Sequence, residues 1–161
     1  MPTSADPPNT PLPDDVCEEI GKHLQLTLVE LIALSLAGKQ LHWNAYGREF
    51  VSLHLHLDRL VGEWRELEDA VAERAAAIGI APDGSAAAVI ELGDLAPLEP
   101  GFTEVERASE DVCARLWDVT VRVRRRAELL GTLDLVSQDV LVDVVRKLEE
   151  QLWMMRAELS D

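Results

Sequence analysis

The segment KQLHWNAYGREFVSLHLHLD, from Lys39 to Asp58, holds three of the four histidines of the chain. His54 and Asp58 are four residues apart, a spacing that places two ligands on one face of a helix. His42 lies earlier, across a helix break expected at Gly47. Imidazole nitrogen and carboxylate oxygen both suit Fe(II), so this segment predicts part of a metal site.

A second acidic pair follows on the same expected helix, Asp69 and Glu73, again four residues apart. A helical step of about 100° per residue puts both pairs on one stripe roughly 100° wide. From His54 to Glu73, however, the helix is roughly 28 Å long at 1.5 Å per residue, so one ion cannot touch both ends. Two copies of this helix packed antiparallel would bring the first pair of one chain to the second pair of the other.

The alternative is a di-iron site inside one bundle, which uses Glu-x-x-His pairs on the helices. The sequence contains no Glu-x-x-His anywhere. This absence favours a site between subunits.

The elements that must carry these residues are all helical. Apolar residues recur at three- and four-residue steps, and glycines punctuate them. We expect residues 1–12 to form a flexible Pro-rich tail and residues 13–161 one domain. The expected helices span about 13–46, 48–78, 86–92 (AAAVIEL), 103–131 with Thr103 as cap, and 134–159. We expect no strand. This order predicts an all-α, ferritin-like four-helix bundle with a short extra helix in the long crossover.

Composition restricts the partners. The net charge of −15 over 161 residues repels polyphosphate, which argues against nucleic acid and anionic membranes and favours cations. Cys17 and Cys113 have no CxxC spacing and are expected to stay reduced in a cytoplasmic protein, since no secretory signal is evident. The apolar run LQLTLVELIALSLAG is interrupted by polar residues, so we expect a buried helix there and no membrane span.

Three motifs together carry a family resemblance. KQLHWNAYG, FVSLHLHLD and ELEDAVAERAAAIG resemble the Dps family (DNA-binding proteins from starved cells, or mini-ferritins), whose pattern is His-Trp-Asn, then Leu-His with Asp four later, then Asp-x-x-x-Glu-Arg before Gly. The spacing across these motifs is kept. The resemblance covers about residues 20–160, including LWMMRA near the C-terminus.

The resemblance implies a ferroxidase centre shared between subunits. His42, His54 and Asp58 would come from one chain, and Asp69 and the bridging Glu73 from its two-fold partner. Trp43 beside the centre would match the tryptophan of the family, which can pass or absorb an electron. The family forms hollow homo-dodecamers that oxidise Fe(II), preferentially with hydrogen peroxide, and store ferric mineral, which protects against oxidative stress.

A second acidic group, Asp134, Asp139 and Asp143, begins the last helix. It could compensate the helix dipole, or it could line an iron uptake pore at a three-fold axis, where family members place acidic residues. The resemblance favours Asp134 and Asp139 for the pore.

Other polar and aromatic residues have simpler interpretations. RVRRR (122–126) is expected to form ion pairs rather than a DNA surface, since carboxylates abound. His23 and His56 are expected to be structural, because His56 points about 200° from His54. Trp64, Trp117 and Trp153 are assigned to the core or to interfaces.

DNA binding is the property of the family that this chain supports least. Many Dps proteins hold DNA through Lys/Arg-rich tails, whereas the first basic residue here is Lys22 and the C-terminus ends in MRAELSD. The leading hypothesis is therefore an iron-oxidising and iron-storing enzyme. A DNA-coating nucleoid protein with secondary iron chemistry is the alternative, and a shell that binds zinc or another metal without turnover is a third possibility.

Overall fold

The four long helices follow the apolar periodicity of the sequence. The computed structural model describes residues 10–159, so residues 1–9 of the expected tail lie outside the described residues. The helices are α1 (Asp14–Asn44), α2 (Phe50–Ala77), the short α3 (Ala86–Leu92), α4 (Val105–Leu130) and α5 (Leu135–Glu158). Strand β1 (Ala45–Tyr46) pairs in parallel with β2 (Thr103–Glu104).

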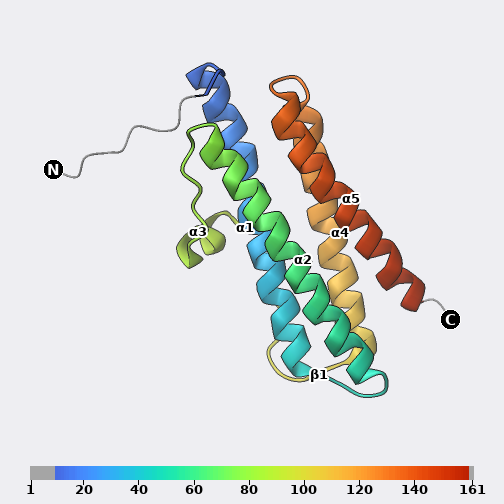
Figure 1. The fold of residues 1–161 in the computed structure, drawn as a ribbon. Coiled ribbons are helices and arrows are strands. Elements are labelled where there is room, and N and C mark those ends of the chain that lie inside the picture. Colours follow the sequence, from blue (N-terminus) through green and yellow to red (C-terminus); the bar gives the residue numbers. More distant parts are fainter. Residues whose placement is uncertain (1–9, 160–161) are drawn as a thin grey trace.

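The bundle consists of two antiparallel helix pairs packed against each other. α1 packs on α2 and α4 on α5, while α1 also contacts α4 and α2 contacts α5. The crossover from α2 carries α3 along α1 and returns to the β1 end before α4 begins (Figure 1). α2 and α4 therefore run in the same direction, as the long connection requires. This arrangement confirms the predicted all-α, ferritin-like bundle with an extra helix in the crossover.

α1 and α2 approach each other closely in the core. Trp64 of α2 is fully buried, and its indole Nε1 donates a hydrogen bond of 2.8 Å to Gln151 Oε1 on α5. A Cβ at Gly38 would lie 2.6 Å from Trp64 Cζ3, so the close approach of the two helices requires glycine at this position. Gly38 lies one turn before His42, and this contact fixes the distance between the two helices that carry the candidate site.

Several predicted boundaries were wrong by a few residues. α1 ends at Asn44 rather than Tyr46, because Ala45 and Tyr46 pair with Thr103 and Glu104. These two-residue strands were not expected. Thr103 is consequently not a helix cap, since the N-cap of α4 is Glu104, without a side-chain hydrogen bond. The start expected near residue 48 is at Phe50.

Among the described residues, α1 alone is long and apolar enough to cross a membrane by length and composition. In the bundle, 56% of its most apolar window is buried. A core helix passes the same test, and α1 packs here against α2, α3 and α4.

Candidate metal centre

His42 and His54 hold each other across the short connection between α1 and α2. His42 lies in the last turn of α1 and is 7% exposed, and His54 lies in the first turns of α2. His42 Nδ1 is 2.8 Å from the carbonyl oxygen of His54, and His54 Nδ1 is 3.0 Å from the carbonyl oxygen of His42. The two rings stack with centroids 3.7 Å apart and planes 19° from parallel.

These contacts determine which nitrogen of each ring carries the proton. A carbonyl oxygen only accepts, so each Nδ1 must donate. In the neutral ring, Nε2 then keeps its lone pair, the form in which histidine binds metals. A backbone carbonyl that orients the other ring nitrogen is a common outer contact of metal-ligating histidines. The main chain thus orients both rings as it would orient those of metal ligands.

Asp58 forms an ion pair with a lysine of α1. Lys39 Nζ lies 2.6 Å from Asp58 Oδ1, and the same ammonium is 6.0 Å from the centroid of the Trp43 ring. The hydrogen bond and charge of Lys39 lower the pKa of Asp58, with smaller contributions from His42 and His54. Asp58 is therefore an anion near both histidines, and a metal ion would have to compete with Lys39 for it.

Asp69 and Glu73 lie further along α2, and both are exposed. Within residues 10–159, no three His, Cys, Asp or Glu side chains come close enough to hold one metal ion. The structure thus pairs His42 with His54 near Asp58, and it leaves Asp69 and Glu73 apart from them. The length of α2 between the two pairs keeps the five expected ligands from meeting within one chain.

Comparison with known proteins identifies the family. A family model described as "Ferritin-like domain" matches residues 21–161. The DNA protection during starvation protein of Mycolicibacterium smegmatis is 33% identical over 151 residues, covering 92% of this chain and 81% of that protein. The chain belongs to the Dps family.

One relative of this Dps chain carries a different name, and solved Dps structures share its fold. The fine tangled pili major subunit of Haemophilus ducreyi is 34% identical over 147 residues, covering 88% of this chain and 75% of that protein. Among solved structures, Mycobacterium smegmatis Dps superposes with a TM-score of 0.92 at 30% identity, covering 98% of this chain and 90% of that one. Dps from Microbacterium arborescens in the high iron form gives 0.88 at 26% identity, covering 96% and 99%.

The expected pore residues of this Dps chain differ in their contacts. Asp134 caps α5 by accepting a hydrogen bond of 2.7 Å from Ser137 N, and it also accepts one of 2.7 Å from Arg74 Nη2. Burial would raise the pKa of Asp134, but the Ser137 hydrogen bonds and the Arg74 charge outweigh it and hold the pKa below its usual value. Asp143 pairs with Arg146 at 2.6 Å, and Asp139 is exposed. A pore role for Asp134 would come in addition to this structural role.

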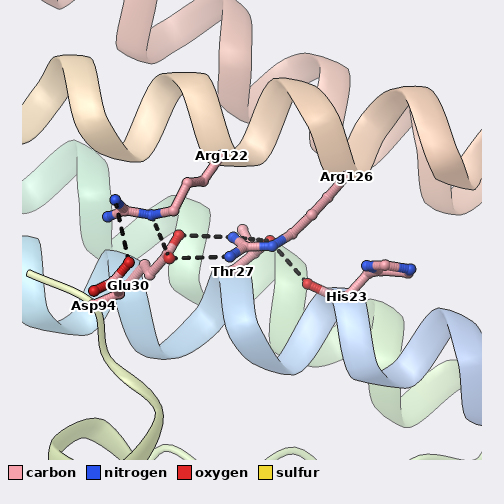
Figure 2. A network of polar contacts seen from close by, with 6 residues as sticks. All are labelled: His23, Thr27, Glu30, Asp94, Arg122 and Arg126. Carbon is pink, nitrogen blue, oxygen red and sulfur yellow. Dashed lines mark hydrogen bonds and ion pairs between the residues drawn. The ribbon is translucent and has the colours of Figure 1, made fainter.

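The arginine cluster of α4 forms ion pairs. Arg122 and Arg126 both bind Glu30 of α1, a carboxylate with only 1% exposure, at distances of 2.7 Å (Figure 2). The neighbouring Arg124 pairs with Glu149 of α5. Three of the four arginines thus hold helices together, as predicted from the abundance of carboxylates.

The two histidines assigned structural roles make contacts of their own. His56 Nδ1 lies 3.4 Å from Glu158 of α5, and the His56 side chain is 9% exposed. His23 Nε2 lies 3.6 Å from Glu19 one turn earlier. Neither histidine takes part in the His42–His54 pair.

Three residues with defined roles were missed in the sequence. Glu30 interrupts an apolar run, which could have marked it as a buried carboxylate in need of cations. Lys39 precedes His42 by three residues and so shares its helix face. Arg74 directly follows Glu73, but nothing in the sequence indicates its contact with Asp134, which requires α2 to lie against α5.

Proposed function

We propose that this protein oxidises Fe(II) at di-iron centres shared between two copies and stores the ferric product in a hollow shell of twelve. The observation that carries the proposal is the reciprocal His42–His54 pair. It presents two metal-binding nitrogens from stacked rings 3.7 Å apart. The planes of the two rings are nearly parallel and separate, so one ion could not lie along the lone pairs of both. Each ring thus suits one ion of a pair, as in two-metal sites.

The missing ligands are carboxylates. Asp69 and Glu73 of a second copy, with α2 antiparallel, would face His54 and Asp58, and Glu73 would bridge the two ions. Three carboxylates so gathered repel one another without a cation, which adds to the affinity for Fe(II). With peroxide as oxidant, two Fe(II) ions each give one electron, the O–O bond breaks and two hydroxides form. The exposed Trp43, whose ring lies 6.0 Å from the ammonium of Lys39 that pairs with Asp58, would lie next to this centre. When a single Fe(II) supplies one electron to peroxide, Trp43 would supply the second, so that the O–O bond breaks to two hydroxides and the indole is left as a radical cation.

The shell is proposed from the family and from the surface of the chain. Large apolar side chains lie exposed on several helices, and where such side chains gather on one face they mark contacts with other chains. They include Leu36, Trp43, Val51, Leu55, Leu135 and Trp153. A solved relative is described as Dps in a high iron form, which supports iron as the substrate. The basic cluster of α4 does not support the DNA-coating alternative, since Arg122, Arg124 and Arg126 are engaged with carboxylates.

Complementation between variants tests the shared centre. His54→Ala and Glu73→Ala should each abolish rapid Fe(II) oxidation by peroxide, followed as ferric absorbance. When the two variants are unfolded and refolded together, mixed pairs regain one intact centre, so activity should return. His56→Ala is the matched control and should oxidise iron as the unmodified protein does. If the mixture stays as inactive as the separate variants, the centre is not shared. If all variants match the unmodified protein, it is not a ferroxidase centre at all.

A further inference from the structure

One face of α2 is exposed along its whole length. The exposed residues recur at three- and four-residue steps, and we call them the outer stripe of α2: Val51, Leu55, Asp58, Arg59, Gly62, Arg65, Glu66, Asp69 and Glu73. The stripe contains both halves of the candidate metal centre. On α1, the exposed Leu36 and Trp43 flank it, because Lys39 between them reaches Asp58.

The metal centre determines the register in which two such stripes would meet. If His54 and Asp58 face Asp69 and Glu73 of a second copy, the two α2 helices cross midway between the pairs, near residues 63 and 64. Each residue then lies opposite the residue equally far from this point on the partner. The argument rests on the shared centre proposed above.

Symmetry decides which edges of the stripes come together. A two-fold axis between antiparallel helices brings each edge of a stripe against the same edge of its copy. Arg59 and Glu66 lie at about 140° and 120° from His54 around the helix, on one edge. Along the helix, Glu66 of the partner subunit falls about two residues, or roughly 3 Å, from the point opposite Arg59. An arginine side chain spans this offset.

The local structure leaves Arg59 able to reach across. Its contact within the chain is a long one, with Nε 3.8 Å from Glu63 Oε1, and its side chain is 57% exposed. At the crossing, Gly62 faces open space, since a Cβ added there would meet nothing within 4 Å in its own chain. Because glycine has no side chain, the second helix can approach closely at this position. The partner's Arg65 falls opposite this glycine, which leaves room for its long side chain.

We infer that Arg59 of each copy pairs with Glu66 of the other, and that these two symmetric ion pairs fix the antiparallel register that completes the metal centre. Oppositely charged groups across an interface set its register and exclude wrong pairings, whereas like charges brought together oppose association. Arg59 and Glu66 are positioning residues and do not bind the metal.

Charge reversal tests this inference without metal. The complete protein is prepared in a chelator, and its mass is measured by native mass spectrometry and sedimentation. Arg59→Glu places two glutamates at each contact, and Glu66→Arg places two arginines there. Each variant alone should lose the two-fold contact, with a dissociation constant at least about tenfold higher. Arg107→Glu makes the same charge change on α4, where Arg107 forms ion pairs with Glu110 and Asp111 of its own helix, and should not alter the mass.

The decisive measurement is a mixture of the two single variants. In a mixed pair both contacts become Glu–Arg, so the variants should associate with each other although neither associates with itself. The double variant carrying both changes should also regain the mass of the unmodified protein. Single variants that keep that mass, or a mixture that fails to associate, would overturn the inference. Since no iron is present, a lack of ferroxidase activity with intact charge-dependent pairing would refute the proposed function alone.

Discussion

Asp134 connects the C-terminal end of α2, the helix that carries the second half of the candidate centre, to the start of α5, and its removal allows a quantitative prediction. It caps α5 through Ser137 N and holds Arg74, which directly follows Glu73 on α2. Losing an N-cap costs about 1 kcal/mol. In the pair with Arg74, the Asp134 side chain is 11% exposed and the Arg74 side chain 18% exposed. Loss of this partly exposed pair should therefore cost about 1–2 kcal/mol, less than the 3–5 kcal/mol of a fully buried pair. Asp134→Ala should thus lower the free energy of unfolding by about 2–3 kcal/mol.

Urea unfolding at fixed protein concentration measures this loss of stability. Two further variants separate the contribution of the helix cap from that of the Arg74 pair. Asp134→Asn keeps a good capping side chain and removes the charge, so it should lose only the Arg74 part, about 1–2 kcal/mol. Asp139→Ala changes an exposed aspartate one turn later and should stay within about 0.5 kcal/mol of the unmodified protein. If Asp134→Ala costs no more than Asp139→Ala, the argument from the cap and the Arg74 pair is refuted.

The pH dependence of the same variants gives an independent check. The pKa of Asp134 is lower in the folded chain than in the unfolded one, because Ser137 and Arg74 favour the carboxylate. The unfolded state then binds more protons, so the stabilisation is present above the ordinary aspartate pKa and is lost as the pH falls through the folded value. The difference between the unmodified protein and Asp134→Asn should therefore shrink in acid. A difference that grows below the ordinary aspartate pKa would contradict the sign.

Two other variants test contacts in the same bundle. Glu30→Gln removes the counter-charge of Arg126 and leaves Arg122 with its longer contact of 3.8 Å to the exposed Asp94. Because Glu30 is nearly fully buried, the change should lower the free energy of unfolding by about 3–5 kcal/mol in the same urea assay; a loss below about 1 kcal/mol would contradict this role. Lys39→Met removes the ammonium that pairs with Asp58, so the pKa of Asp58 should rise. Divalent cations should then bind more tightly, as measured by calorimetry, since the lysine no longer competes with them. Weaker binding would show instead that Lys39 supports the site.

The sequence allowed prediction of the helices that carry the candidate ligands, but not of the contacts that orient these side chains. Amphipathic periodicity is local, and α3 was predicted with its observed bounds. The reciprocal bonds between His42 and His54 instead depend on how the chain turns between two helices, and no spacing rule encodes that turn. Glu30 and Arg122 are 92 residues apart, so their pairing follows only from the packing of α1 on α4.

The two short strands were missed for the same reason, because they depend on a contact between distant segments of the chain. Ala45 and Tyr46 looked like the end of a helix because nothing local stops it before Gly47. They leave the helix because Thr103 and Glu104, at the end of the long crossover, offer backbone partners. A short parallel bridge of this kind joins segments far apart in sequence and has no periodicity of its own.

The separation of the two ligand pairs on one rigid helix also has a consequence in mass-action terms. On the proposed function, a newly made or highly diluted chain holds only half of each centre, and the length of α2 prevents it from folding back to complete one. Iron oxidation would then rise with the square of protein concentration at high dilution, and linearly once all chains are paired. A single chain would not catalyse the reaction of Fe(II) with peroxide. The activity would begin only when a second chain binds, which is also the first step in assembling the shell that stores the product.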